Sequence, residues 1–284
     1  MSRIEQALEK AIQNRESASP QVSTPDKQRE SLKSTSPLPV FQIKDSIIDP
    51  SLVDRHIVCI IDPISASAEQ YRKLKGRILA TTKQDFQNTV MVSSADVGEG
   101  KSITAINFAV ALAQEIDHTV LLIDADLRVP SIHKYLGITV DRGLSDYLAG
   151  TVELSDVLIH TGIGKLVLLP AGNICPNPAE LLSSNRMTEL VHELKHRYVD
   201  RYIVIDTPPI LVSSDAISIS MNVDGVIIVV AAAKTSEKTV KRGVNLIKNA
   251  PILGIVYNNV PLYLGKNLHP YNYYHYNRDN QTTT

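Results

Sequence analysis

One stretch of this sequence carries residue types that can hold phosphate groups. It reads ADVGEGKS over residues 95–102, between the apolar run 90–92 and a helical pattern that begins at Ser102. Glycines let the backbone turn successive N–H groups toward phosphate oxygens, and the N-terminus of the following helix adds a favourable dipole. The stretch therefore predicts a phosphate-binding loop.

The side chains of this loop suit a nucleotide and its metal ion. Lys101 would reach the β- and γ-phosphates, and the Ser102 hydroxyl would bind Mg²⁺. Ala95 stands where glycine is usual, and its small side chain is compatible with the turn. The alternative is a glycine turn that only joins a strand to a helix. The predicted nucleotide-binding residues of the loop are Val97, Gly98, Glu99, Gly100, Lys101, Ser102 and Ile103.

Three aspartates end two further apolar runs. LLIDADLR places Asp124 and Asp126 at the end of one run, and YIVIDTPP places Asp206 at the end of another. Ligands of open parallel sheets bind at the carboxyl ends of the strands, and hard oxygen ligands suit Mg²⁺. A single aspartate there could simply cap the next helix. Together with the lysine loop, however, the three favour a metal site made of Ser102, Asp124, Asp126 and Asp206.

The elements that must position these residues alternate along the chain. From residue 89 onward, apolar runs of strand length follow helical patterns, and the runs are apolar throughout rather than at every second residue. Strands buried on both faces have this composition. The pattern predicts an α/β fold with a mostly parallel, doubly wound sheet and helices on both faces.

Composition narrows the possible partners and location. The chain has 284 residues, 43% of them hydrophobic, which suits one main domain. Its formal net charge of -1 gives no global basic field, so no nucleic-acid partner is expected. Two cysteines without metal or redox spacing fit a reducing compartment, and no secretory signal or membrane-spanning run is found. We therefore expect a cytoplasmic protein.

Four segments are expected. Residues 1–16 have the apolar spacing of an amphipathic helix, which is either a frayed arm or a docking element, and residues 17–55 have the composition of a flexible linker. Residues 56–260 form the predicted catalytic domain. Residues 261–284 are expected to be a flexible, tyrosine-rich tail.

The combination of AxxGEGKS, LLIDADLR and IVIDTPP resembles the bacterial tyrosine kinases, the P-loop autokinases of capsule and exopolysaccharide synthesis, over residues 64–260. The three motifs match that family's Walker A, Walker A′ and Walker B. The resemblance implies a deviant-Walker P-loop fold of the ParA/MinD type, with ATP and Mg²⁺ as cofactors. It also implies that Lys101, Asp124 and Asp126 are catalytic, that Asp124 accepts the tyrosine proton, and that Asn258 meets adenine.

The resemblance extends to the tail. The family's autokinases end in a tyrosine cluster at the C-terminus. The resemblance implies that the residues phosphorylated in trans here are Tyr263, Tyr271, Tyr273, Tyr274 and Tyr276. Each phosphate adds about -1.5 to -2 charges, which could loosen an assembly. The alternative is a tail that is merely disordered or sticky.

A further stretch resembles the family's ExxRxxR oligomerisation motif. Its counterparts are Glu69, Arg72 and Lys75. Lys75 stands where the motif has its second arginine. Because lysine lacks the planar fork of arginine, this substitution affects the strength of the implied ring assembly. These three residues also fit an ordinary solvated helix face.

Partners follow from the resemblance as well. It implies a membrane polysaccharide co-polymerase, of the chain-length-determinant type, that activates the kinase and recruits it to the inner face of the cell membrane. It also implies a cognate protein-tyrosine phosphatase. The stretch MSRIEQALEKA resembles kinases of exosortase-linked polysaccharide systems.

Two other functions fit the same loop. A ParA/MinD-type partition or positioning ATPase would carry a signature lysine five residues before Lys101, where this chain has Asp96. It would also need a basic membrane helix or a basic surface, which the sequence does not show. A non-catalytic, ATP-gated scaffold of a polysaccharide export complex is the other alternative, although the chain retains every metal-binding acid.

Overall fold

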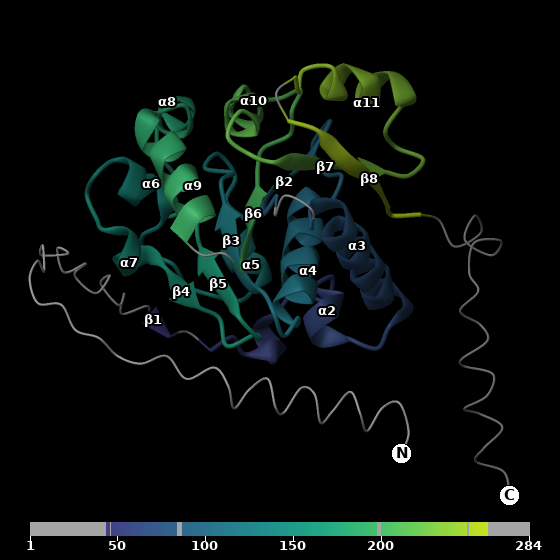
Figure 1. The fold of residues 1–284 in the computed structure, drawn as a ribbon, viewed down its shortest axis with the longest axis horizontal. Coiled ribbons are helices and arrows are strands. Elements are labelled where there is room, and N and C mark those ends of the chain that lie inside the picture. The colour runs from purple at the N-terminus through teal and green to yellow at the C-terminus, as the bar shows by residue number, and fades with distance from the viewer. Residues whose placement is uncertain (1–43, 46, 84–86, 198–199, 249, 261–284) are drawn as a thin grey trace, which may run out of the picture. The chain divides into compact units, whose positions relative to one another are not determined.

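The computed structural model describes residues 44–45, 47–83, 87–197, 200–248 and 250–260 (Figure 1). The predicted helix at 1–16 and the tyrosine-rich tail at 261–284 lie outside these residues. Their predicted roles therefore remain predictions.

A single sheet organises the described residues. Its eight strands follow the order β1-β4-β5-β3-β6-β2-β7-β8, and every neighbouring pair is parallel except β4 and β5. The strands are β1 (Lys44–Asp45), β2 (Thr89–Ser94), β3 (Thr119–Asp124), β4 (Ile159–His160), β5 (Leu166–Leu169), β6 (Arg201–Asp206), β7 (Gly225–Ala231) and β8 (Ile252–Asn258). The expected mostly parallel α/β fold is confirmed.

The apolar runs form strands because both faces of the sheet are covered. Successive residues of a strand point to opposite faces. In β2, accordingly, Met91 packs into one apolar core while Val90 and Val92 pack into the other. All residues of β2 and β7 are buried, which explains why these runs show no polar alternation.

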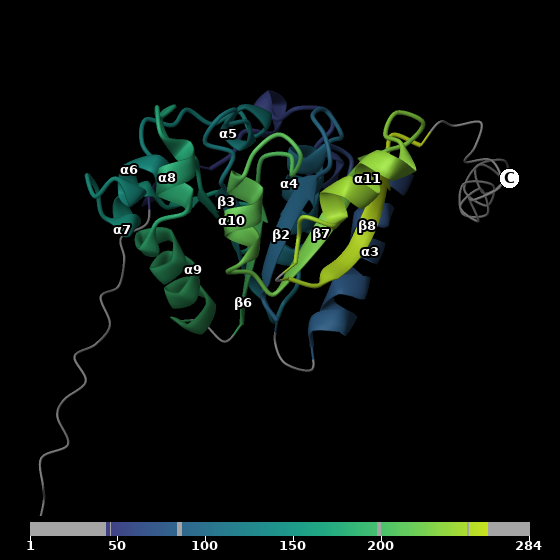
Figure 2. The ribbon, with the colours of Figure 1, turned by 90° about the horizontal axis from the view of Figure 1, so that it is seen from above.

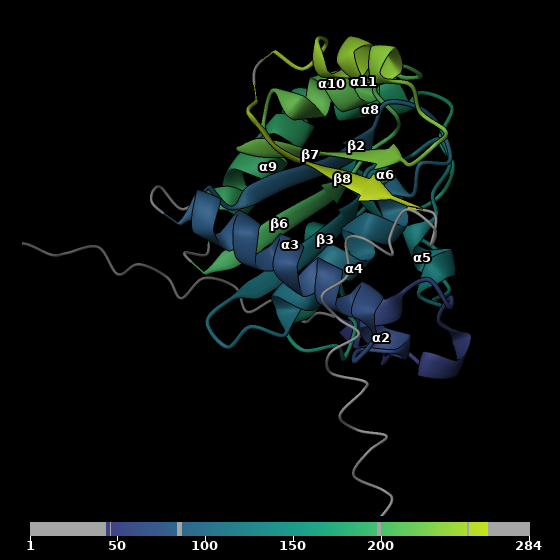
Figure 3. The same ribbon diagram turned by 90° about the vertical axis from the view of Figure 1, so that its right-hand side faces the viewer.

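Helices form a layer on each face of the sheet (Figure 3). One layer contains α2 (Val58–Ile61), α3 (Ala66–Thr82), α4 (Lys101–Ala113) and α5 (Ile132–Tyr135), and the short helix η1 (Pro50–Leu52) precedes it. The other layer contains α6 (Leu144–Leu148), α7 (Leu154–Val157), α8 (Pro178–Leu182), α9 (Asn185–Arg197), α10 (Asp215–Ser220) and α11 (Glu237–Val244). Figure 2 shows β8 at one edge of the sheet, between α3 and α11.

The end of the predicted linker belongs to the folded domain. Ile48 and Val53 are buried in the core beneath α4, and Asp49 caps η1 by accepting a hydrogen bond from Ser51 N at 2.9 Å. The prediction of a flexible linker is therefore wrong for residues 47–55. Two buried apolar side chains, a helix cap, and backbone hydrogen bonds from Ile48 to Thr161 and from Asp54 to Tyr135 hold this segment, although its composition is otherwise polar.

No helix among the described ranges combines the length and apolar character that a bilayer crossing requires.

Candidate active site

The predicted phosphate loop joins β2 to α4 at the carboxyl edge of the sheet. The strand that ends at Asp206, β6, lies between β2 and β3, and Asp206 is in register with Val92 on one side and Asp124 on the other. Parallel pairing therefore brings the loop and both acidic strand ends together, as the sequence predicted.

Two glycines give the loop its path. Gly98 and Gly100 have φ values of 72° and 89°, in the left-handed region that residues with a Cβ rarely adopt. A Cβ on Gly100 would also lie 2.1 Å from Asn258 Nδ2. The Asn258 amide donates a hydrogen bond to the Glu99 carbonyl at 2.9 Å and thus supports the loop from behind.

Glu99 holds the loop by its side chain. The residue is 1% exposed; its Oε2 accepts from Asp96 N at 2.7 Å, and its Oε1 accepts from Ala231 N at 3.4 Å and from the Thr235 hydroxyl. The loop is thereby tied to the end of β7. Sequence reasoning named Glu99 only as a loop residue, because two of its three partners, Ala231 and Thr235, lie more than a hundred residues away.

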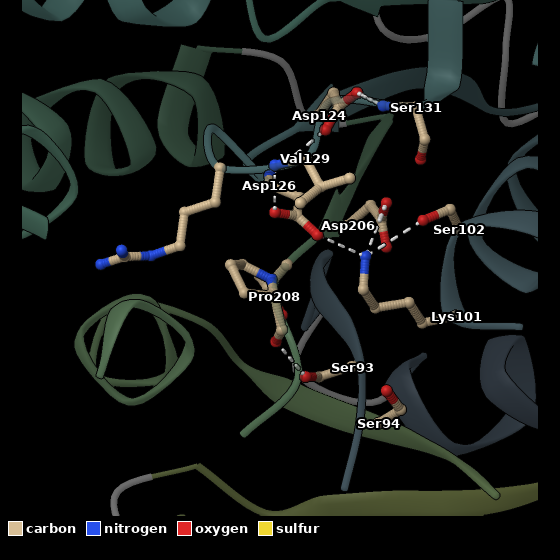
Figure 4. Close-up of polar contacts among 12 residues, drawn as sticks. Ser93, Ser94, Lys101, Ser102, Asp124, Asp126, Val129, Ser131, Asp206 and Pro208 are labelled. Carbon is tan, nitrogen blue, oxygen red and sulfur yellow. Dashed lines mark hydrogen bonds and ion pairs between the residues drawn. The ribbon is translucent and has the colours of Figure 1, made fainter. Parts of the chain in front are cut away.

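The Lys101 ammonium lies among the acidic groups (Figure 4). Its Nζ is 2.7 Å from Asp126 Oδ2 and 3.7 Å from Asp206 Oδ2, and it donates to Ser102 Oγ at 3.1 Å. Burial disfavours the charged ammonium, but Asp206 and Asp126 outweigh this effect and raise the pKa of Lys101. The lysine remains charged and neutralises the carboxylates around it.

Asp124 is turned away from this ammonium. Its Oδ2 accepts from the backbone N–H groups of Ser131 and Ile132, both at 3.1 Å, and its Oδ1 accepts from Asp126 N at 3.2 Å. The carboxylate thus organises the loop that follows β3. Burial, with a contribution from Asp206, raises the pKa of Asp124 to about 7.

Asp206 is fully buried, and within the described ranges neither of its side-chain oxygens has a hydrogen-bond partner, although the Lys101 ammonium lies 3.7 Å from Oδ2. Burial raises the pKa of this carboxyl to about 6, although Lys101 opposes the shift. A buried carboxylate whose oxygens accept no hydrogen bond from the described residues, next to the Ser102 hydroxyl and Asp126, fits a site for a hard cation.

The donor set also indicates which kind of cation site this is. The described ranges contain no group of three or more His, Cys, Asp or Glu residues arranged to hold a metal. Mg²⁺ needs no such cage, because one or two carboxylates together with nucleotide phosphates and water complete its octahedron. The residues present fit a cation that binds together with a nucleotide.

A cavity of about 300 Å³ opens at this edge of the sheet. Its lining combines the phosphate loop with the segments that follow β3 and β6: Val97, Gly98, Gly100, Lys101, Ser102, Ile103, Asp126, Arg128, Val129, Ser131, Tyr135, Pro208, Pro209 and Val212. Four of the predicted nucleotide- and metal-site residues are not part of this lining: Glu99, Asp124, Asp206 and Asn258. Sequence reasoning missed the apolar side of the cavity, where Val129 and Val212 are exposed.

The predicted oligomerisation residues lie apart from the cavity, on α3. Arg72 Nε is 2.6 Å from Glu69 Oε2, and Arg72 also donates to the Pro63 carbonyl at 2.7 Å. Lys75 pairs with Glu115, just beyond α4, within the same chain. The third position of the motif is therefore engaged in holding two helices together.

The fold and this site define a P-loop nucleotide-binding protein. In agreement, the model of the ParA family, described as NUBPL iron-transfer P-loop NTPase, matches residues 85–282. MinD from Pyrococcus horikoshii, solved with Mg-ADP, shares the fold with a TM-score of 0.53 at 24% identity, covering 64% of this chain and 77% of that one.

Within this class the chain belongs to the bacterial tyrosine-protein kinases. It is 35% identical to tyrosine-protein kinase YwqD of Bacillus subtilis over 214 residues, which cover 75% of this chain and 89% of YwqD. It is 31% identical to tyrosine-protein kinase Etk of Escherichia coli over 205 residues, or 72% of this chain and 28% of Etk. The solved kinase domain of Etk superposes with a TM-score of 0.67 at 29% identity, covering 72% of this chain and 82% of that domain. The protein is therefore a protein-tyrosine kinase.

Proposed function

We propose that this kinase transfers the γ-phosphoryl group of Mg-ATP to tyrosines of its own C-terminal tail, in trans. The observation that carries this proposal is the Lys101 ammonium between Asp126 and Asp206, beside a phosphate loop and an accessible cavity. Phosphoryl transfer depends mainly on positioning and charge neutralisation, and these groups can supply both.

Nucleotide binding begins at the loop. Backbone N–H groups of residues 97–102 and the start of α4 would surround the phosphates, and adenine would lie on the Asn258 side of the loop. Lys101 would leave Asp126 and turn to the phosphates, because a polyphosphate offers more negative charge than one carboxylate. Asp126 and Asp206 would then need another cation.

Ser102 and Asp206, with Asp126 close by, would hold that cation. Mg²⁺ bound there would neutralise charge that develops on the phosphate oxygens during transfer. The buried Asp206 carboxylate supports this assignment, because Lys101 is its ion-pair partner at 3.7 Å and would turn to the phosphates when a nucleotide binds. Asp124 was also predicted to be a ligand, but its oxygens are occupied by three backbone N–H groups.

The acceptor proton is better assigned to Asp126 than to Asp124. A general base must reach the hydroxyl from which it takes the proton. Asp126 lines the cavity, whereas Asp124 lies beneath the loop and orients Asp126 through its backbone N–H. We therefore propose Asp126 as the base and Asp124 as the residue that positions it.

The proposed acceptors are Tyr263, Tyr271, Tyr273, Tyr274 and Tyr276. Val129 and Val212 line the cavity together with Asp126 and are exposed, so a tyrosine ring would find apolar surface beside the proposed base. This apolar lining favours an aromatic acceptor over a serine.

The biological setting is proposed from the family. Tail phosphorylation would regulate polymerisation and export of an exopolysaccharide or capsule. A membrane co-polymerase of the chain-length-determinant type would activate the kinase at the inner face of the membrane. A cognate phosphatase would reverse the reaction, and rings built through Glu69, Arg72 and Lys75 would be one state of the cycle.

The test is to incubate the purified chain with Mg-ATP and to map phosphotyrosine by mass spectrometry. We expect modification within residues 263–276 and none in Lys101→Met. Mixing Lys101→Met with an active chain whose tail tyrosines are Phe should label the Lys101→Met tail, because transfer is in trans.

Replacing Tyr271, Tyr273, Tyr274 and Tyr276 by Phe should remove most of the label and leave ATP affinity unchanged. The matched control is Tyr257→Phe, an exposed tyrosine on β8. Unchanged labelling of the fourfold variant would refute the tail as acceptor, while the kinase activity itself would stand.

A further inference from the structure

A buried carboxylate outside the predicted site binds one of the residues that line the cavity. Asp215 begins α10 and its side chain is 0% exposed. Arg128 Nε lies 2.7 Å from Asp215 Oδ2, and Arg128 Nη2 lies 3.2 Å from Asp215 Oδ1. This two-bond fork fixes the orientation of both side chains as well as their separation.

The pair joins two segments that flank the cavity. Arg128 belongs to the segment after β3, in which Val129 N donates to Asp126 Oδ1 at 3.1 Å. Asp206 is the last residue of β6, and Asp215 lies at the end of the segment that follows β6. The fork therefore connects the segment after β3, which carries Asp126, with the segment that follows Asp206.

The chemistry of the pair makes it a firm connection. Loss of Arg128 would leave the buried Asp215 carboxylate without its charged partner, which is destabilising. The Arg128 side chain is 44% exposed and lines the cavity, whereas the Asp215 side chain is fully buried. The buried Asp215 can therefore hold Arg128 in place at the side of the cavity while ligands enter.

We propose that Asp215 is a positioning residue for phosphoryl transfer. By holding Arg128, it fixes the segment around Asp126 against the segment after Asp206. It thereby sets the spacing within which Lys101 releases Asp126 and a cation takes its place. This inference rests on the proposed roles of Asp126 and Asp206, and it assigns Asp215 and Arg128 no contact with the reacting atoms.

The experiment is a double-mutant cycle of Asp215→Asn and Arg128→Gln in the full chain. The readouts are kcat for phosphorylation of a synthetic glutamate–tyrosine copolymer and the dissociation constant of ATP with EDTA and with Mg²⁺. Each single variant should lower kcat by about 10- to 100-fold, as expected for a displaced catalytic group. The affinity for ATP in EDTA should stay within about 2-fold of the wild-type value, since the phosphate loop is intact. The increase in ATP affinity on adding Mg²⁺ should be smaller than in the wild type.

The double variant should be no slower than the slower single variant, because both changes break the same connection. Asp224→Asn is the matched control: it breaks the Lys195–Asp224 pair at the amino end of β7, opposite the carboxyl ends that carry the site, and should lower Tm without changing kcat.

Losses that multiply in the double variant would overturn the inference, as would a lower Tm of Asp215→Asn with unchanged kcat and unchanged Mg²⁺ dependence. The copolymer keeps this test separate from the tail proposal. A wild-type chain that labels the copolymer but not its own tail would contradict only the latter.

Discussion

At the scale of single residues, the site is organised by the charge of one lysine. The Lys101 ammonium contacts Asp126 and lies near Asp206, and so occupies the region where a bound cation would be needed. ATP and its metal must therefore compete with an internal ion pair. This competition makes opposite predictions for binding and for transfer when Asp126 is changed.

Asp126→Asn should bind ATP more tightly in EDTA than the wild type does, by about 3- to 10-fold, because Lys101 is released and a repelling charge is removed. The same variant should lose at least about 100-fold in kcat, because the proposed base is gone. Titration with a fluorescent ATP analogue measures the first effect, and the copolymer assay measures the second.

Asp124→Asn provides the comparison for this prediction. It should lower Tm, because the carboxylate that orders residues 126–132 loses hydrogen bonds, and it should reduce kcat less than Asp126→Asn does. The opposite ranking of kcat would return the role of the base to Asp124.

Asp206 predicts a pH dependence of stability. Burial raises its pKa to about 6 from an ordinary value of 3.8, so the folded chain retains a proton that the unfolded chain releases between these values. Stability of the nucleotide-free protein therefore falls as pH rises through this interval. Asp206→Asn should remove the part of this loss of stability that Asp206 causes. The Tm of the variant minus that of the wild type should therefore be larger at pH 8 than at pH 5.

Asp49→Asn serves as the control of opposite sign. The Ser51 backbone N–H lowers the pKa of this exposed carboxyl, so its contribution is stabilising above the ordinary carboxyl range and is lost as pH falls. Its substitution should lower Tm slightly at pH 8. A Tm advantage of Asp206→Asn that does not grow with pH would contradict the cause given for the shift.

At the scale of elements, the phosphate loop depends on its connection to β7. Glu99→Gln keeps the size of the side chain but brings an amide NH₂ against groups that already donate hydrogen bonds. A buried donor without an acceptor costs about 1–3 kcal/mol, so ATP affinity should fall about 10-fold or more. Glu237→Gln, on the exposed face of α11, should leave affinity unchanged; equal effects of the two variants would contradict the role of Glu99.

Which site residues could be predicted from the sequence depends on the elements that place them. Lys101, Ser102, Asp126 and Asp206 could be predicted because each is placed by a strand end or by the glycine loop, both of which leave local signals. The Arg128–Asp215 pair spans 87 residues and has no spacing that marks it. The packing of Ile48 and Val53 was missed for a related reason, since tertiary contacts rather than local composition order residues 47–55.

At the scale of the whole molecule, the proposed ring assembly depends on α3, which carries the three predicted oligomerisation residues. Lys75 is engaged with Glu115 in the same chain, so we expect Lys75→Ala to lower Tm and to leave assembly largely unchanged. Arg72, at the middle of the motif and partly exposed, is the better candidate for contact with a second copy. Arg72→Ala should shift the mass measured by light scattering toward the monomer.

The control for assembly is Arg77→Ala on the exposed surface of the same helix. If Lys75→Ala dissociates the assembly and Arg72→Ala does not, the proposed division between these two residues is wrong.

The most direct test of the account is a crystal structure with Mg²⁺ and a non-hydrolysable ATP analogue. We predict that the triphosphate lies on residues 97–102, that Lys101 has left Asp126 for the phosphates, and that the metal contacts the Ser102 hydroxyl beside Asp206. A nucleotide bound elsewhere, or a Lys101 that still pairs with Asp126 while the metal lies away from Asp206, would contradict it.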